Sequence, residues 1–206
     1  VVEGQQLALA NYVARDIDGK ILQRQALLES LAASLPVDAL GKPGRLRDWL
    51  KERYNYQALF SAGLFVVDAR GVAIADYPVL PGRENADYAD RDYIRGGLEG
   101  RSNVGRPIIG RAAREPVLPL AAPIRNGRNE VVGVLAGITA LAAPGFLEAL
   151  QQTRIGGKTG GFLLVSPQDE LFVASSQADM VLKRTPPTGV NALHDKAMAG
   201  FRGSGV

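Results

Sequence analysis

AGLFVVDARGVAIADYP, residues 62–78, predicts a β-hairpin and so decides the kind of fold that follows. Two runs rich in valine, phenylalanine and isoleucine flank the turn DARG at 68–71, which is the pattern of two antiparallel strands joined by a tight turn. Three more runs of this kind follow after short polar turns: RPIIGR at 106–111, EPVLPLAAPIR at 115–125 and EVVGVLAGITAL at 130–141. We therefore expect an antiparallel arrangement of five strands, with edges or bulges at Pro116, Pro119 and Pro123.

Upstream of the hairpin the periodicity is helical. One long helix is expected over residues 2–34, ended by Pro36, because its apolar residues fall within about a third of the helical circumference. At ~1.5 Å per residue it is about 50 Å long, which suits a stalk or a dimer seam as well as a core helix over a sheet. Its apolar positions are Leu9, Val13, Ile17, Ile21, Leu27, Leu28 and Leu31. A second helix is expected over roughly 45–60, with Leu46, Trp49, Leu50 and Phe60 on one side.

Between the hairpin and the later strands lies a polar segment, residues 79–103. Within it, DYIRGGLEG at 92–100 is able to form a short helix ended by Gly96 or Gly100.

The C-terminal part of the chain repeats the design of the first module. After a predicted helix at 144–155, GGKTGGFLLVSPQDELFVASS (156–176) is again strand, turn and strand, and a helical piece at 191–201 is expected to end at Gly203. We therefore expect helices over 1–60, one sheet module over 61–152 and part of a second over 153–206. Both ends of the chain look cut, which indicates an excised domain.

Composition excludes several classes of protein. Of the 206 residues 46% are apolar and 22% charged, which is ordinary for a globular domain. The net charge is +3 and no Lys/Arg run exceeds two residues, so no nucleic-acid partner is expected. The longest apolar run, VVGVLAGITAL at 131–141, is too short to cross a bilayer. The chain has no cysteine, so disulfides and thiolate metal sites are excluded.

No catalytic, metal or cofactor pattern is evident in the sequence. His194, the only histidine, reads as a surface or capping residue. GGKTGG at 156–161 has Gln152 where a phosphate loop needs glycine, and it reads more simply as a flexible hinge. We therefore expect no cofactor, no metal and no enzymatic activity for this part of the protein.

The combined motifs resemble the double Cache sensor domains of bacterial membrane receptors. They are LFVVDARGVAIADYP (64–78), YADRDYIRGGLEG (88–100), VGRPIIGRAAREPVLPLAAPIRN (104–126), EVVGVLAGITALAAPGFLEAL (130–150) and GGKTGGFLLVSPQDELFVAS (156–175). The resemblance implies an α+β fold: a long N-terminal helix, then two PAS-like modules with antiparallel sheets, the second incomplete. It also implies a periplasmic, ligand-sensing domain of a protein anchored in the inner membrane.

The output domain is implied less specifically. LRDWLKERYNYQALFSAGLFVVDARG (46–71) is most similar to the sensors of GGDEF diguanylate cyclases, which make cyclic di-GMP. Histidine kinases and chemoreceptors carry similar domains, so these outputs stay open.

The resemblance also places a ligand pocket. In the family, the segment matching DRDYIRGG (90–97) lines the pocket of the membrane-distal module. The amino-acid-binding subgroup has Arg-x-Trp-Tyr-x-Asp there, and an acid late in the sheet pairs with the ligand's ammonium. Here Arg91 matches the arginine and Tyr93 takes the tryptophan's place.

The amine-binding half of that pattern is missing. Ile94 replaces the tyrosine, Gly96 replaces the aspartate, and Ile138 stands where the late acid would be. A small anion such as a carboxylate is therefore expected rather than an amino acid.

Five residues are the candidate ligand contacts. Arg91 offers a planar fork that holds a carboxylate, and Tyr93 forms a wall of the pocket. Arg106 and Arg111 would add positive potential, and Tyr77 would face the same cavity. In the alternative interpretation, Asp90 and Asp92 merely pair with Arg91 and Arg95 and cap the short helix.

Signalling would follow from a shift in populations. A ligand that binds two arrangements of the long helices unequally changes their ratio. The apolar stripe of residues 2–34 would serve as the seam of a homodimer. A dimerising spacer with an empty pocket is the remaining alternative.

Overall fold

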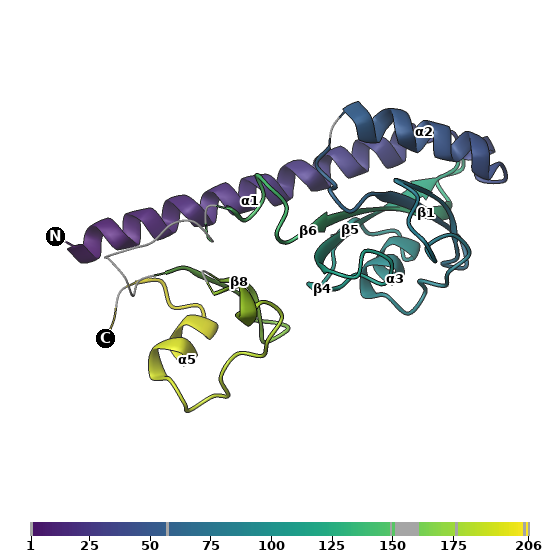
Figure 1. The fold of residues 1–206 in the computed structure, drawn as a ribbon. Helices are drawn as coiled ribbons and strands as arrows, with labels where there is room; N and C mark the ends of the chain where they lie inside the picture. Colours follow the sequence, from purple (N-terminus) through teal and green to yellow (C-terminus); the bar gives the residue numbers. More distant parts are fainter. Residues whose placement is uncertain are drawn as a thin grey trace. The chain divides into compact units, whose positions relative to one another are not determined.

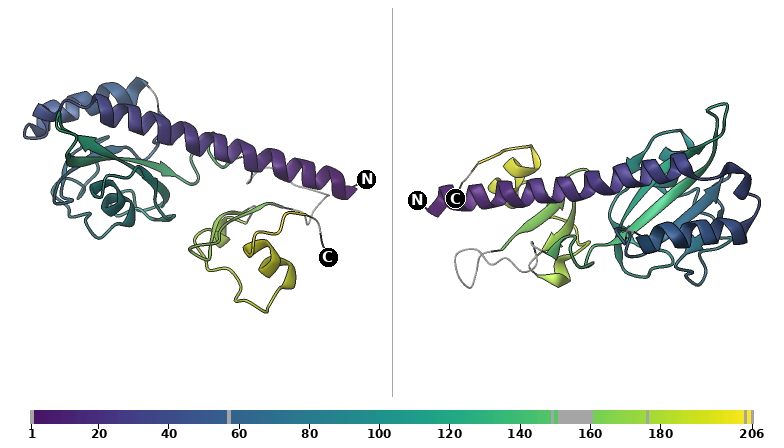
Figure 2. Two further views of the ribbon diagram at one scale, coloured as in Figure 1. Left: turned by 180° about the vertical axis from the view of Figure 1, so that it is seen from behind. Right: turned by 90° about the horizontal axis from the view of Figure 1, so that it is seen from above.

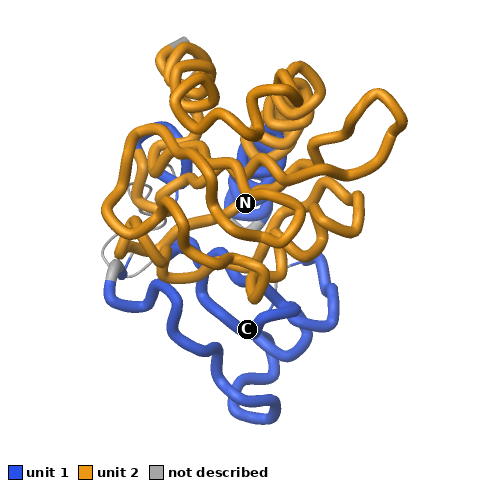
Figure 3. Tube along the Cα trace, turned by 90° about the vertical axis from the view of Figure 1, so that its right-hand side faces the viewer, with its two compact units in different colours: residues 1–19, 144–206 blue, residues 20–143 orange. Residues whose placement is uncertain are grey.

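The computed structural model describes residues 2–56, 58–148, 150, 161–175, 177–203 and 205. They form two compact units, coloured separately in Figure 3. The sheet unit is Lys20–Ala143, and the terminal unit is Val1–Gly19 together with Pro144–Val206. The units divide at 19 and 143, whereas the sequence division was at 60 and 152, so the latter stays a prediction.

The predicted long helix is confirmed. Helix α1 runs over Val2–Ser34, and each of the seven apolar residues of its predicted stripe is buried or half-buried. A short 3-10 turn, η1 (Val37–Ala39), leads to α2 (Pro43–Tyr56). The prediction extended this second helix too far, because Phe60 lies beyond its end. Phe60 is nevertheless buried, at 1% exposure.

The strands form one antiparallel sheet with the order β2-β1-β6-β5-β3, while β4 also pairs with β5. The predicted hairpin is confirmed as β1 and β2, and the predicted long runs as β5 and β6. The sheet has six strands rather than five, since 103–104 adds a short one. The strands are β1 (Leu64–Asp68), β2 (Ala73–Tyr77), β3 (Asn103–Val104), β4 (Ile108–Ile109), β5 (Pro116–Arg125) and β6 (Val131–Ala140).

The prediction of edges or bulges at the prolines of β5 is confirmed only in part. Around Pro116 and Pro119 the strand lies between β6 and the short strands β3 and β4, whereas at Pro123 no strand pairs with it opposite β6. Pro119 pairs with Ile138 of β6, and the Pro119 carbonyl accepts a hydrogen bond from Gly105 N–H at 2.9 Å on the other side. On that side β5 meets only the two-residue strands β3 and β4. Pro119 is tolerated because its missing N–H falls on the side of β3 and β4, between which the ladder is interrupted. A bulge does occur, at Ile124/Arg125.

Both faces of the sheet are buried, because side chains alternate between them. Phe65 and Val67 of β1 join a core with Val134 and Ala136 of β6 on the α3 side. On the other face lie α2 and the C-terminal part of α1, as Figures 1 and 2 show. A Cβ on Gly137 would point to this second face, only 2.5 Å from the Phe60 ring.

Helix α3 (Asp92–Leu98) is the predicted short helix. It continues through Gly96 and ends before Gly100, whose φ of +86° favours glycine. Gly97 lets the helix approach β6 closely, since a Cβ there would lie 2.6 Å from the Val134 side chain. This contact holds the C-terminal turn of α3 against the core of the sheet.

The described part of the terminal unit contains the second hairpin, β7 (Leu163–Ser166) paired with β8 (Leu171–Ser175), as predicted. After η2 (Ala178–Met180), helix α5 (Ala192–Met198) begins at Asn191, whose side chain accepts hydrogen bonds from two backbone N–H groups. This helix ends before Gly200, not at Gly203 as predicted. Of the predicted helix at 144–155, residues 149 and 151–155 lie outside the described residues. Residues 144–147 form turns and a bend rather than helix, and 148 and 150 are helical. The predicted hinge at 156–161 lies outside the described residues except for 161.

The described helices include none that is both long and apolar enough to cross a membrane. No group of three or more potential metal-binding side chains occurs among the described residues either.

Candidate functional site

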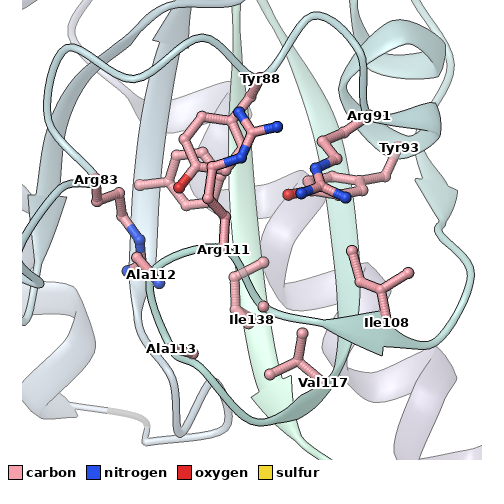
Figure 4. A pocket seen from close by; sticks show the side chains of 12 residues that line it. Arg83, Tyr88, Arg91, Tyr93, Ile108, Arg111, Ala112, Ala113, Val117 and Ile138 are labelled. Carbon is pink, nitrogen blue, oxygen red and sulfur yellow. The ribbon is translucent and has the colours of Figure 1, made fainter. Parts of the chain in front are cut away.

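A narrow pocket lies in the sheet unit, on the α3 face of the sheet (Figure 4). Its polar walls are Arg83, Tyr88, Arg91, Tyr93 and Arg111. Its apolar or small walls include Phe65, Ile108, Ala112, Ala113, Val117 and Ile138. The free space between these side chains is about that of one water molecule.

Arg91 and Tyr93 are placed by the start of α3. Arg91 holds the N-cap position with extended backbone angles, and Tyr93 lies in the first turn at 3% exposure. Burial, the largest cause, raises the pKa of Tyr93 above that of an ordinary phenol. The Tyr93 hydroxyl therefore stays protonated at neutral pH and can donate a hydrogen bond to an anion.

The acidic residues beside Arg91 do not use all of the hydrogen-bond donors of its guanidinium. Arg91 Nε is 3.8 Å from Asp90 Oδ2, which is beyond hydrogen-bond range. Asp92 instead accepts hydrogen bonds from the backbone N–H groups of Tyr93 at 2.8 Å and Arg106 at 3.2 Å. In the alternative interpretation, Asp90 and Asp92 pair with Arg91 and Arg95. Of these pairs, the structure supports only the loose contact between Asp90 and Arg91.

Arg111 comes from the loop between β4 and β5 and is tied to the segment before α3. Its Nη2 donates to both carboxylate oxygens of Asp90, at 2.9 and 3.1 Å, and its Nη1 donates to the Asp87 carbonyl. Its guanidinium carbon lies 5.1 Å from the centre of the Tyr88 ring. These contacts hold the β4–β5 loop across the pocket.

Two of the predicted contacts do not line this pocket. Tyr77 ends β2 and packs edge-on against Tyr54, with 5.4 Å between ring centres. Arg106 is exposed. The structure thus brings together Arg91, Tyr93 and Arg111, and the ligand-binding role of all five residues stays a prediction.

Two polar residues of the pocket were not identified from the sequence. Arg83 is 2% exposed, and its Nη2 donates to the Ala62 carbonyl at 3.1 Å. Tyr88 is 3% exposed and stacks at a tilt on Phe65, 4.8 Å between ring centres. Arg83 lies in the loop PGREN, where the sequence suggests only a polar turn, so no local pattern marks it as buried. Tyr88 opens the motif YADRDYIRGGLEG, and this position was the one sequence feature that could have identified it as a pocket residue.

Arg83 also forms a buried ion pair with Asp76 of β2. The distance between Arg83 Nη1 and Asp76 Oδ2 is 3.9 Å, and the Asp76 carboxylate accepts a hydrogen bond from Leu80 N–H at 2.8 Å. Burial is the largest influence and raises the pKa of Asp76, although the Leu80 hydrogen bond and the Arg83 charge oppose it. The fold therefore favours the protonated form of Asp76 more than the unfolded chain does.

This shift predicts a pH dependence. The free energy of unfolding of the wild type, relative to Asp76→Asn, is expected to fall as pH rises from the ordinary Asp pKa of 3.8 through the raised value. Over that interval the folded state binds more protons than the unfolded state, so stability decreases with pH. Trp49, the only tryptophan, lies in α2 of the sheet unit and reports its unfolding in denaturant. A difference that rises with pH would show that Arg83 keeps the carboxylate charged.

The side chains that line the pocket carry positive charge only, while Asp90 and Asp76 pair with its arginines from outside the lining. Three guanidinium groups line it, and among its described lining residues none is Asp or Glu. Ile138, where the amino-acid-binding pattern needs an acid, points its apolar side chain into the pocket (Figure 4). The arrangement suits an anionic group, because arginine and tyrosine supply hydrogen-bond donors in a shielded site.

Comparison with known proteins identifies the fold. The ligand-binding domain of the PctC amino acid chemoreceptor of Pseudomonas aeruginosa PAO1, in complex with GABA, superposes with a TM-score of 0.68 at 23% identity, covering 88% of this chain and 80% of that one. The sensor domain of the V. cholerae histidine kinase DctB gives a TM-score of 0.68 at 15% identity, covering 93% and 75%.

A third structure is the ligand-binding domain of the Pseudomonas aeruginosa PAO1 chemoreceptor PctB in complex with L-Arg, with a TM-score of 0.67 at 22% identity and coverage of 88% and 68%. These similar structures are ligand-binding and sensor domains, not enzymes, and at such identities they show the fold alone. No curated protein sequence matches the chain. The family model dCache_1, described as a Cache domain, matches residues 1–204, and the chain therefore belongs to the Cache domain family.

Proposed function

We propose that this domain senses a small anion on the extracytoplasmic side of a bacterial membrane receptor. The observation that supports the proposal is the pocket of the sheet unit. Three arginines line it, and none of its described lining residues is acidic. Arg91 would hold the ligand's acid group with its guanidinium, and the Tyr93 hydroxyl would donate to the same group. Arg111 would add positive potential.

An organic acid without an amino group suits the pocket better than an amino acid. PctC and PctB were solved with GABA and L-Arg, which carry both an acid and an amine. In this chain Ile138 and Ile94 offer no charge to an ammonium group. An unpaired buried ammonium would be costly, so such ligands are disfavoured.

The closed state of the pocket suggests how a ligand would act. Because the free space is about that of one water molecule, a ligand must displace the β4–β5 loop, which Arg111 ties to Asp87 and Asp90. A ligand that binds only the open state shifts the population toward it. That shift is the proposed signal.

The wider setting of the domain is part of the proposal. We place it in the periplasm, in a receptor anchored in the inner membrane, as a homodimer formed through α1. The output is proposed to be a GGDEF diguanylate cyclase, and this proposal is supported only by the sequence resemblance. A histidine kinase or a chemoreceptor is the alternative, favoured by the similarity to DctB, PctC and PctB.

A panel of small molecules tests the ligand class. Thermal unfolding of the purified domain is measured with butyrate, 2-hydroxybutyrate, butyramide and 2-aminobutyrate. The two acids without an amine are expected to raise Tm, because a ligand at 100 times its Kd stabilises by about 2.7 kcal/mol. Butyramide, which lacks the charge, and 2-aminobutyrate should have little effect. Stabilisation by the amino acid alone, or by none of the acids, would contradict the proposal.

A further inference from the structure

One carboxylate outside the pocket pairs with two of the three arginines that line it. Asp90 Oδ2 is 2.9 Å from Arg111 Nη2 and 3.8 Å from Arg91 Nε, and Asp90 Oδ1 accepts a second hydrogen bond from Arg111 at 3.1 Å. Asp90 does not line the pocket, and its side chain is 59% exposed. It therefore binds, from outside, guanidinium donors that an anion in the pocket would use.

The contact between Asp90 and Arg111 joins two segments that are 21 residues apart in the sequence. Asp90 lies in the segment that precedes α3, and Arg111 belongs to the loop of residues 110–115 between β4 and β5. The Arg111 side chain reaches from this loop to the ring of Tyr88, as Figure 4 shows, and its Nη1 donates to the Asp87 carbonyl. The position of the loop across the pocket thus depends on what the Arg111 guanidinium binds.

The closed loop leaves too little space for a ligand. The free space is about that of one water molecule, so an organic acid enters only when the loop moves. The loop is held in place as long as Arg111 keeps its hydrogen bonds to Asp90. The Asp90 carboxylate and the acid group of a ligand suit the same planar guanidinium, and they therefore compete for it.

We propose that Asp90 is an internal competitor of the ligand and thereby sets the ligand concentration to which the domain responds. In the ligand-free state its carboxylate holds Arg111 and keeps the loop closed. In the bound state the ligand's acid group replaces Asp90 as the partner of Arg111. The inference rests on the proposed function, since it takes the ligand to be an anion. It goes further by naming a residue outside the pocket that lowers the affinity for this anion.

Asp90→Asn is expected to raise the affinity for butyrate about three- to fivefold, as measured by calorimetric titration. The change removes the charge at nearly constant size, so a larger fraction of the ligand-free protein is open and the apparent affinity rises by that factor. The gain is that of an exposed ion pair, because the side chains of Asp90 and Arg111 are 59% and 35% exposed. An unchanged or lower affinity would overturn the proposal.

Glu99→Gln is the matched control for the loss of one negative charge. Glu99 also pairs with an arginine, Arg101, and its side chain is 49% exposed, but it does not line the pocket. The affinity for butyrate should be almost unchanged in this variant. An equal gain in Glu99→Gln and Asp90→Asn would overturn the proposal, because the anion would then respond to the net charge of the chain.

A double-mutant cycle separates the hold on Arg111 from the local charge of Asp90. In the Arg111→Gln background, Asp90→Asn should change the affinity much less than in the wild type, since no guanidinium is left at 111 for Asp90 to hold. The same three- to fivefold gain in both backgrounds would overturn the proposal, because Asp90 would then act by its charge alone.

Hydrogen exchange of the ligand-free protein tests the same contact without a ligand. The N–H groups of Gly110 and Arg114 donate to the carbonyls of Glu115 and Gly110, both at 2.9 Å. Both should exchange about three- to fivefold faster in Asp90→Asn, and not in Glu99→Gln, because the loop opens more often. Unchanged exchange in Asp90→Asn would overturn the role of Asp90. Absence of acid binding in every variant would instead overturn the proposed function.

Discussion

Replacing Phe60 with alanine is expected to lower the free energy of unfolding of the sheet unit by about 3–5 kcal/mol. Phe60 is among the largest fully buried side chains, at 1% exposure. Its ring covers the backbone of β6 at Gly137, where a Cβ would lie 2.5 Å from two ring atoms. Removing the ring reduces the buried apolar area and leaves a cavity next to Gly137, which has no side chain to fill it. Denaturant unfolding followed by Trp49 fluorescence measures the loss.

A double-mutant cycle tests whether the ring lies over Gly137. Gly137→Ala alone is expected to destabilise by about 1–3 kcal/mol, because the ring must move to admit the methyl group. The same change should cost clearly less in the Phe60→Ala background, since the obstacle is gone. Gly127→Ala is the matched control, as a Cβ there meets nothing within 4 Å. Additive effects at Phe60 and Gly137 would show that the two residues do not touch.

The largest effect on binding is expected for Arg91→Ala. The Arg91 side chain is 26% exposed, and hydrogen bonds to a charged group contribute about 1.5–3 kcal/mol, so the affinity for an organic acid should fall about tenfold or more. Arg91→Lys should recover only part of this loss, because lysine keeps the charge without the planar fork. Calorimetric titration with the acids that stabilise the wild type provides the measurement.

Arg106→Ala is the control for Arg91→Ala. Arg106 is a neighbouring arginine that is exposed and does not line the pocket. Its removal changes the net charge of the chain as much as Arg91→Ala does, but it should change the affinity less than about threefold. Equal losses in the two variants would mean that the anion is attracted by overall charge, not held by Arg91.

Much of the fold was predictable because it rests on local patterns. The stripe of α1 and the DARG hairpin follow from periodicity and turn residues, and both are confirmed. The position of β5 was not predictable in this way. Its prolines suggested edges or bulges, but around Pro116 and Pro119 the sheet places it between β6 and two short strands. Strand order is a property of long-range pairing, which no single segment encodes.

The pocket residues also divide into those that a local sequence pattern predicts and those that depend on distant segments. Arg91 and Tyr93 were predicted from the resemblance of their segment to a family pattern, and the structure places both on the pocket wall. Arg83 was missed because its burial depends on Asp76 and Ala62, which come from other segments of the chain. Tyr77 and Arg106 were named because they lie close to the motif or the first hairpin, and chain proximity did not bring them to the pocket.

The most direct test of the central claim follows the arginine side chains themselves. In an NMR titration of the domain with an organic acid, the Nε–Hε signals of the arginines are assigned by single substitutions. The account predicts a saturable shift of the Arg91 signal, with the same Kd as calorimetry, and no shift of the Arg106 signal. Saturable binding that leaves the Arg91 signal unchanged would contradict it, because the acid would then be bound elsewhere.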